Sequence, residues 1–272
     1  MARGVPLDKI LKQGTPITLE KREAWIIQAI GTNSTTRGRL VIDGKPTGDI
    51  VQLIAPLHTL DTNLLGPLPL GDYYYVVPPE TKVEWQGATG SKARIIGTKV
   101  IFDPGENLGE PYATRSRNQY SSYITYIEGT FSKGTDVAWP AGEENEVISL
   151  TPLTIEKYIF DSILMATVAN VSGGVSEGDW SITFYIDNTP LENIVASGEQ
   201  VGVDVLSAPR PPADGADETP FTLQAFPIEL TGDHNLSIRV KNTSGASKSP
   251  PAGASITATV TVLTKYFKPL AP

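Results

Sequence analysis

One pattern occurs twice in this chain: Arg-Leu-Val-Ile-Asp-Gly-Lys-Pro-Thr-Gly-Asp-Ile-Val at residues 39–51 and Thr-Phe-Tyr-Ile-Asp-Asn-Thr-Pro-Leu-Glu-Asn-Ile-Val at residues 183–195. Each copy is an apolar β run, a turn built on Asp-Gly or Asp-Asn, a proline and a second apolar pair. Gly and Asn tolerate the positive φ angles that tight hairpin turns need. The repeat therefore predicts one β-hairpin in each half of the chain.

A second pair of similar segments lies near the end of each half. Residues 93–102 read Ala-Arg-Ile-Ile-Gly-Thr-Lys-Val-Ile-Phe, and residues 254–263 read Ala-Ser-Ile-Thr-Ala-Thr-Val-Thr-Val-Leu. These copies are further apart than the hairpins, as expected if loops were lengthened between duplicated strands. A period near half the chain indicates two related domains, because solenoid repeats are only about 20–50 residues long. The length of 272 residues suits two domains of about 130 residues each.

Most of the other segments are short apolar runs separated by Gly, Pro and Asn turns, and helix signals are scarce. We therefore predict an all-β protein of two tandem, duplicated antiparallel β-sandwich domains that are jelly-roll-like. The expected parts are an N-terminal arm (1–22), a first β-sandwich (23–131), a linker rich in Gly, Glu and Asp (132–147) and a second β-sandwich (148–272).

The charge is negative overall but uneven along the chain. The formal net charge is −8, which argues against a nucleic-acid or anionic-membrane surface for the body of the protein. Residues 1–22 carry a local net charge of +3, whereas the chain from Ile148 onward carries seven cations against thirteen acids. No apolar run approaches the roughly 18 residues of a membrane span, and the first residues lack the apolar core of a signal peptide.

Few residues in the chain suit catalysis. With no cysteine, disulfides, thiol chemistry and Cys-ligated metals are excluded. The only histidines are His58 and His234, and the chain offers few partners for a His-based triad or for a metal site with several His ligands. We interpret both as packed or turn residues. We therefore expect no catalytic, cofactor or metal residues, no cofactor and no enzyme activity.

Carboxylates leave two alternatives open. The pairs Asp103/Glu106 and Asp217/Glu218 are the candidates for a glycoside hydrolase, which works with two acids. Both pairs lie in polar loops, with nothing to suggest the burial that raises the pKa of a catalytic acid. Acidic loop residues are also ligands for structural calcium, although these groups lack a regular ligand spacing.

Aromatic side chains give an alternative function. Tyr73 and Tyr75 lie two apart in an apolar run, so in a β-strand both point to one side. Flat rings on one side suit stacking against sugars. The alternative to a structural role is therefore a carbohydrate- or host-surface-binding β-sandwich module, with a host glycan as ligand.

Two basic segments are candidates for contacts between subunits. The first is the arm, which we expect to reach a neighbouring subunit; a frayed terminus is the alternative. Its proposed contact residues are Lys9, Ile10, Leu11, Lys12, Lys21 and Arg22. The second is the pair Arg115 and Arg117, beside Tyr112 and Tyr120, which is either a subunit contact or a plain surface loop.

A duplicated β-sandwich with turn-rich loops, a basic N-terminal segment, no cysteine and no catalytic set resembles the structural proteins of virus particles. Within that group it is similar to the jelly-roll capsid proteins of tailless icosahedral phages and to phage spike or decoration proteins. The resemblance implies a homo-oligomer that contacts other virion proteins and resides in the virion. It also implies an acidic second domain that faces outward, with residues 207–220 as its tip.

Overall fold

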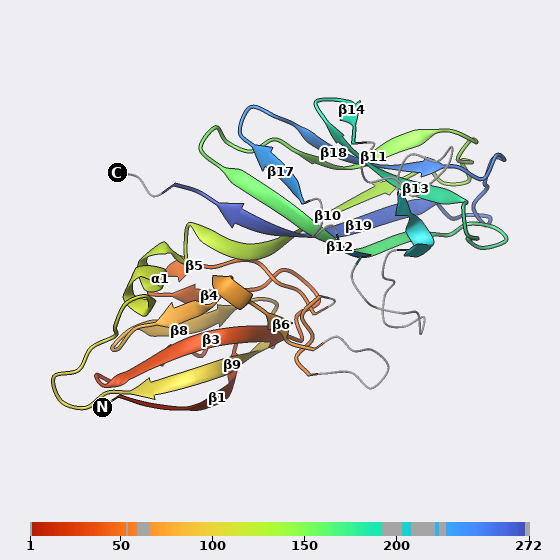
Figure 1. The fold of residues 1–272 in the computed structure, drawn as a ribbon. Helices are drawn as coiled ribbons and strands as arrows, with labels where there is room; N and C mark the ends of the chain where they lie inside the picture. Colours follow the sequence, from red (N-terminus) through yellow and green to blue (C-terminus); the bar gives the residue numbers. More distant parts are fainter. Residues whose placement is uncertain are drawn as a thin grey trace. The chain divides into compact units, whose positions relative to one another are not determined.

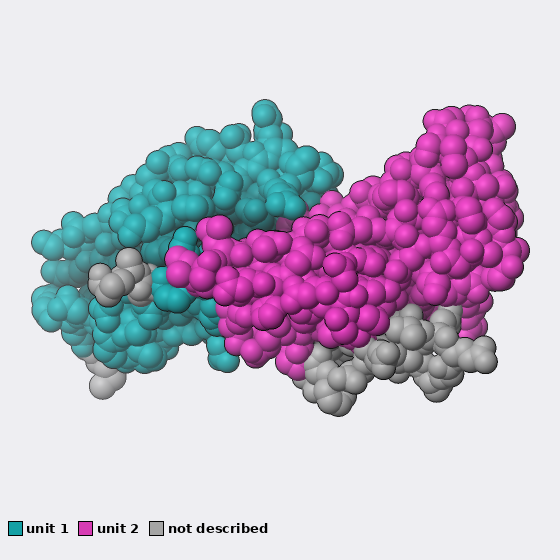
Figure 2. Space-filling view, turned by 90° about the horizontal axis from the view of Figure 1, so that it is seen from above, with its two compact units in different colours: residues 1–125, 266–272 teal, residues 126–265 magenta. Residues whose placement is uncertain are grey.

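The protein is all-β in the computed structural model, which describes residues 2–52, 54–58, 66–191, 203–207, 221–222 and 227–269. About 51% of it is strand and 5% helix. The described residues form four antiparallel sheets (Figure 1). The chain divides into two compact units: unit 1 is residues 1–125 with 266–272, and unit 2 is residues 126–265 (Figure 2).

Unit 1 contains two sheets. The first has the strand order β1-β9-β3-β6, with β7 also paired to β3, and the second has the order β2-β8-β4-β5. The strands are β1 (Arg3–Lys12), β2 (Ile17–Thr18), β3 (Glu23–Thr32), β4 (Arg39–Ile42), β5 (Lys45–Pro46), β6 (Leu68–Pro69), β7 (Tyr75–Val77), β8 (Lys82–Gln86) and β9 (Lys92–Ile101). The largest side chains buried in this unit are Trp25 and Trp85.

Unit 2 is built on two more sheets, one of order β10-β19-β12-β16 with β17 also paired to β12, the other of order β11-β18-β13-β14 with β15 also paired to β13. The strands are β10 (Ser122–Ser132), β11 (Glu144–Leu150), β12 (Lys157–Ala169), β13 (Trp180–Ile186), β14 (Thr189–Pro190), β15 (Val203–Asp204), β16 (Phe221–Thr222), β17 (Ile228–Thr231), β18 (Leu236–Asn242) and β19 (Thr257–Phe267). Strands β10 and β19 both contain the boundary between the units.

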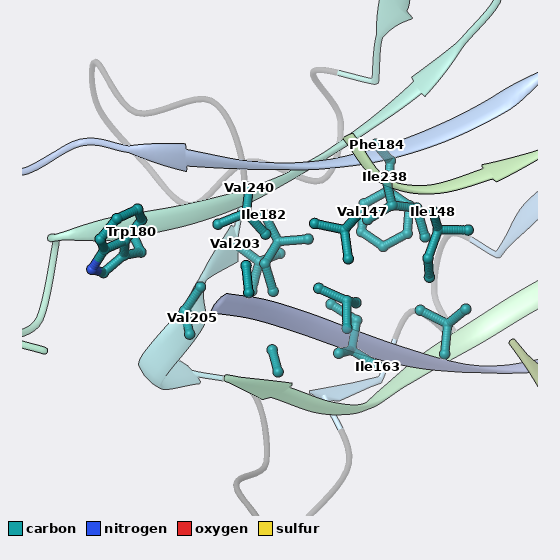
Figure 3. Close-up of a cluster of buried hydrophobic side chains, with 14 of the residues drawn as sticks. Val147, Ile148, Ile163, Trp180, Ile182, Phe184, Val203, Val205, Ile238 and Val240 are labelled. Atoms are coloured by element: carbon teal, nitrogen blue, oxygen red, sulfur yellow. The ribbon is translucent and has the colours of Figure 1, made fainter. Parts of the chain in front are cut away.

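The core of unit 2 lies between its two sheets. Figure 3 shows Val147, Phe184 and Ile238 from one sheet pointing toward Ile163 of β12 in the other. All four side chains are nearly or fully shielded from solvent. Burying an aliphatic or aromatic side chain of this size contributes about 1.5–3 kcal/mol, so this layer is the main source of stability for the unit.

Both units have the same strand order. If β6 with β7, β14 with β15, and β16 with β17 are each counted as one interrupted strand, the described residues of each unit form eight strands. One sheet then takes strands one, eight, three and six, and the other takes two, seven, four and five. Eight strands in two sheets of this order form a jelly roll. The predicted pair of duplicated jelly-roll-like sandwiches is therefore confirmed.

The repeated sequence forms the same hairpin in each jelly roll, between strands four and five. The turn residues are Asp43 and Gly44 in the β4–β5 hairpin, with φ of 51° and 73°, and Asp187 and Asn188 in the β13–β14 hairpin, with φ of 50° and 63°. Two successive positive φ angles define the type I′ turn, which matches the twist of the paired strands. The second matching pair of segments forms β9 and β19, which are strand eight of each unit.

The expected N-terminal arm is largely part of the first jelly roll. Strand β1 pairs with β9 along its whole length, from Arg3 opposite Ile101 to Lys12 opposite Lys92. Leu7 and Leu11 are buried, and these two side chains anchor the strand in the sheet. Residues 3–12 are therefore the edge strand of a sheet and not an arm.

The segment expected to be a linker, residues 132–147, is part of unit 2. Within it Trp139 is fully buried, with its ring edge-on to Phe131 and Trp180 at centroid distances of 5.4 and 5.0 Å. The segment between the two sets of strands is instead residues 102–121. This segment contains the helix α1 (Tyr112–Asn118).

Candidate functional site

The contact residues predicted in the arm lie on the two faces of β1 and in the turn before β3. Lys9 and Leu11 share one face, on which Leu11 is buried and the Lys9 Nζ lies 5.1 Å from the centroid of the Trp25 ring. Ile10 and Lys12 share the other face and are exposed. Lys21 and Arg22 lie in the exposed turn before β3. The predicted contact residues are therefore divided between a core and a surface.

The exposed face of β1 continues onto β9. Ile10 lies directly opposite Arg94, and Lys12 lies opposite Lys92. Two residues further along β9, Ile96 is partly exposed on the same face. Asp8 lies opposite Ile96 on this face. We call these six residues the β1–β9 face. It combines two aliphatic side chains with three basic groups and one carboxylate.

An ion pair fixes one side of this face. The Nε and Nη2 atoms of Arg94 donate to the two carboxylate oxygens of Asp8, at 2.8 and 2.6 Å. The Arg94 hydrogen bonds lower the pKa of the Asp8 carboxyl. The Nη1 atom of Arg94 lies 3.1 Å from Nδ1 of His58, so this histidine is a surface residue that helps to orient the guanidinium.

A second cluster forms around Arg115 of α1. Its Nε donates to the Tyr74 carbonyl at 2.7 Å, and its Nη2 donates to the Ser122 carbonyl at 2.9 Å. The guanidinium also lies over the rings of Tyr73 and Tyr74, at 5.9 and 5.8 Å from their centroids. Burial lowers the pKa of Arg115. We call Tyr73, Tyr74, Tyr112, Arg115 and Phe267 the Arg115 cluster.

Edge-on ring contacts extend the Arg115 cluster on both sides. Tyr112 packs against Tyr74 at 6.1 Å, and Phe267 packs against Tyr73 at 5.9 Å. Tyr112 is 38% exposed, so the cluster reaches the surface. Arg and Tyr are enriched in the centres of protein interfaces. The cluster has the composition of a contact site, with its guanidinium held in place before any partner binds.

Arg117, the other predicted basic residue of α1, does not join this cluster. Its Nη2 lies 3.2 Å from a carboxylate oxygen of Glu110, and both side chains are largely exposed. Solvent screens an exposed ion pair of this kind, so it adds little to stability. Arg117 is therefore a surface residue at the edge of the cluster.

The expectation that Tyr73 and Tyr75 face one side together does not hold. Tyr73 ends a short 3₁₀ helix, η1 (Gly71–Tyr73), and only Tyr75 lies in a strand. Tyr75 is buried, its hydroxyl accepts a hydrogen bond from the Gly48 amide at 3.3 Å, and burial raises its pKa. A ligand at the surface therefore meets Tyr73 but not Tyr75.

Gln119 supports the cluster from beneath, and sequence analysis missed it. Its Oε1 accepts from the Val76 amide at 2.7 Å, and its Nε2 donates to the Val76 carbonyl at 2.9 Å. The side chain is completely buried and pairs with β7 as a neighbouring strand would. This double hydrogen bond fixes the end of α1 to the strand that follows Tyr73 and Tyr74.

The acidic pairs considered for hydrolysis do not form a paired-acid site in the described residues. Asp103 and Glu106 close a turn, in which the Asp103 amide donates to the Glu106 carboxylate and lowers the pKa of Glu106. A catalytic acid needs a raised pKa. Asp217 and Glu218 lie outside the described residues, as does most of the predicted tip at 207–220.

The part of the chain that the structure covers has neither a metal cluster nor a spanning helix. Within it, no three His, Asp or Glu side chains come close enough to hold a metal ion. His234 pairs with Asp187 of the β13–β14 turn, with Nδ1 and Oδ2 2.6 Å apart. None of the helices described is long and apolar enough to cross a membrane.

Comparisons with known proteins gave matches in structure only. No protein-family model matches the chain, and no curated protein matches its sequence. At the level of the fold, the chain resembles viral major capsid proteins. The capsid protein P2 of bacteriophage PM2 matches with a TM-score of 0.30 and 10% identity over 97% of this chain and 98% of that protein. The STIV major capsid protein matches with a TM-score of 0.30 and 10% identity over 99% and 97% of the two chains.

A plant protein matches to a similar degree. The ANX1 ectodomain from Arabidopsis thaliana has a TM-score of 0.28 and 9% identity over 96% of this chain and 82% of that one. All three likenesses are too low to indicate a function.

Proposed function

We propose that this chain is a structural protein of a virus particle, either a capsid protein or a capsid-attached spike or decoration protein. Its role is to associate with copies of itself and with other virion proteins, without catalysis. The particle suggested by the sequence is that of a tailless phage.

The observation that carries this proposal is the tandem pair of jelly rolls with one strand order. A jelly roll buries the inner faces of its sheets and leaves loops, edges and outer faces for contacts with neighbours. A chain with two such units supplies two similar building blocks, so a cyclic oligomer of these chains contains twice as many blocks as chains. Each chain therefore supplies two jelly-roll domains to a particle, and fewer chains are needed to build it.

Two surfaces of unit 1 are the candidates for these contacts. The Arg115 cluster offers Tyr112 on a preformed scaffold, and the β1–β9 face offers Ile10 beside Lys12. Aromatic side chains and Arg are enriched at interface centres, so the Arg115 cluster fits this composition, and the β1–β9 face adds an exposed aliphatic side chain.

The solution mass of the full chain, measured by light scattering across a concentration series, tests the proposal. We expect a defined oligomer, and the variant Tyr112→Ala to weaken association about tenfold without changing the circular dichroism spectrum. Arg117→Ala is the matched control on the same helix, with no expected effect. A wild-type chain that stays monomeric at every concentration, with or without other particle proteins, contradicts the proposal.

The exposed ring of Tyr112 also supports a second candidate, a carbohydrate- or host-surface-binding module. This function predicts a monomer whose binding to a glycan array depends on Tyr112. An oligomer without glycan binding removes this candidate.

A further inference from the structure

The turn between β11 and β12, residues 151–156, exposes two aliphatic side chains. Leu153 is 62% exposed and Ile155 is 54% exposed, more than any other large apolar side chain in the part of the chain that the structure describes. Both lie in one turn and are separated only by Thr154. Exposed apolar side chains that lie close together are a feature of interaction sites.

This turn is held in place by its own hydrogen bonds and by a neighbouring glycine. The Leu153 amide donates to the Glu156 carboxylate at 3.1 Å, and the Glu156 amide donates to the Leu153 carbonyl at 2.8 Å. The Gly232 amide donates to the Glu156 carbonyl at 3.1 Å. A Cβ at Gly232 would lie 2.3 Å from the Thr154 Cα, so the two segments pack as closely as a glycine permits. The exposed side chains are thus preorganised, which lowers the entropic cost of binding.

The net charge of the unit that carries the turn indicates the kind of partner. Unit 2 carries 7 Lys and Arg against 18 Asp and Glu, a net of −11, whereas unit 1 carries 15 against 12, a net of +3. The two units therefore have opposite charge although they share one fold. A net charge of −11 disfavours an anionic lipid surface and favours a basic protein surface.

Unit 1 of a second copy supplies such a surface. The β1–β9 face has Ile10, which is 38% exposed, and Ile96, which is partly exposed. Lys12 and Lys92 lie opposite each other on the same face and are both exposed. Its two aliphatic groups match the pair on the turn, and its lysines match the acidic unit that carries the turn.

We propose that the 151–156 turn of one copy docks on the β1–β9 face of the next copy, so that unit 2 of each chain contacts unit 1 of its neighbour. The two surfaces in such a contact differ, so the association is heterologous and produces a ring or an open chain of subunits. The inference rests on the proposed function and names the contact through which the particle protein associates.

Two double variants each remove one side of the contact. Leu153→Ser with Ile155→Ser removes the apolar turn, and Ile10→Ser with Lys12→Glu removes the receiving face. Each is expected to weaken association at least tenfold in sedimentation or light scattering. All four positions are exposed, so circular dichroism and melting temperature should stay as in the wild type.

Val137→Ser is the matched control. Val137 is 47% exposed in the same unit but lies outside the turn, so association should not change. Raising the salt concentration should weaken the wild-type contact, because screening reduces the attraction between the acidic and basic units.

Mixing the two double variants distinguishes this contact from others. Each variant keeps the surface that the other lacks, so an equimolar mixture should form a dimer of one copy of each and grow no further. If the wild type associates but both double variants associate equally well, or the mixture stays monomeric, the contact is disproved while the proposed function stands. A monomeric wild type disproves both.

Discussion

Unit 1 contains residues from both ends of the described chain, and this arrangement leads to a direct prediction. Tyr266 lies at the end of β19, is nearly buried, and packs against Tyr123 with a centroid distance of 4.8 Å. The Lys268 amide then donates to the Ser121 carbonyl at 2.8 Å. Replacing Tyr266 by Ala should therefore destabilise unit 1, although most of β19 belongs to unit 2.

The size of the effect follows from the packing that the Tyr266 ring provides. Truncation of a buried aromatic side chain to Ala costs about 3–5 kcal/mol, including the cavity that remains. The ring pair with Tyr123 accounts for about 0.5–1.5 kcal/mol of the same total. We expect the free energy of unfolding of unit 1 to fall by roughly 4 kcal/mol.

Val262→Ala is the matched control on the same strand. Val262 lies four residues before Tyr266, is fully buried and belongs to the core of unit 2. Removing two methyl groups from such a site costs roughly 2–3 kcal/mol. This destabilisation should fall on unit 2.

Hydrogen exchange followed by mass spectrometry separates the two outcomes, because peptides from β3 and β9 report on unit 1 and peptides from β13 and β18 report on unit 2. Tyr266→Ala should lower protection in the first group, and Val262→Ala in the second. If either variant lowers protection equally in both groups, or Tyr266→Ala affects only the second, the reasoning is refuted.

Three further variants test other features. Gly44→Ala, in the β4–β5 turn at a φ of 73°, should cost about 1 kcal/mol in urea unfolding, and an unchanged midpoint would disprove the strain. Gln119→Leu should cost about 2–4 kcal/mol, because it leaves the buried amide and carbonyl of Val76 without partners; a decrease smaller than the error of the urea titration would contradict this. At Asp179, burial raises the pKa, but hydrogen bonds from Lys248 and Ser176 outweigh it and the net shift is downward. A carboxyl whose pKa is lower in the folded state stabilises the fold at pH values above its unfolded-state pKa, and this stabilisation is lost as the pH falls through its folded-state pKa. Asp179→Asn should therefore lose less stability than the wild type between about pH 7 and pH 3. Equal losses would contradict the assignment.

The hairpins could be predicted because local chemistry decides them. A type I′ turn requires two residues that accept positive φ, and Asp-Gly and Asp-Asn meet this requirement wherever the flanking runs are apolar. The repeat of this turn in both halves was enough to indicate duplication. The order of the strands within each sheet could not be predicted from the sequence, because it depends on pairings between distant segments such as β1 and β9.

Strand β1 was missed because a lysine interrupts its apolar alternation. Leu7 and Leu11 face the core, and Lys9 lies between them on the same face. Lys9 is accommodated there because its ammonium group lies over the ring of Trp25, which belongs to another strand. In the alternation of apolar and polar residues, the polar Lys9 stands where a core-facing strand residue is expected to be apolar, so the pattern does not predict a strand.

The segment 132–147 was misread for a related reason. Its Gly, Glu and Asp residues are typical of a linker, yet the segment contains one fully buried tryptophan. The Trp139 Nε1 donates to the Glu143 carbonyl at 3.0 Å, and Nδ2 of Asn242 donates to the Trp139 carbonyl at 2.9 Å. The average composition of a segment does not show that one of its side chains, here Trp139, is buried.

Sequence analysis named three of the five residues of the Arg115 cluster, with Tyr73 assigned to a different site. Arg115 and Tyr112 were visible because they are close in the chain, whereas Tyr74 and Phe267 join them only through the fold. The exposed pair Leu153 and Ile155 gave no signal at all, since apolar residues before a strand are usually buried. Exposure is a property of the folded chain, and no local pattern predicts it for a single turn.

The division of unit 1 between distant segments sets an order for synthesis. Unit 2 is one continuous stretch, residues 126–265, and can close as soon as that stretch has left the ribosome. Unit 1 begins emerging first, but Tyr123 and Tyr73 lack their ring partners until residues 266 and 267 have been made. A nascent chain therefore carries strands β1 to β9 of the first jelly roll before these two ring contacts can form, and the contacts form only when the second jelly roll is almost complete.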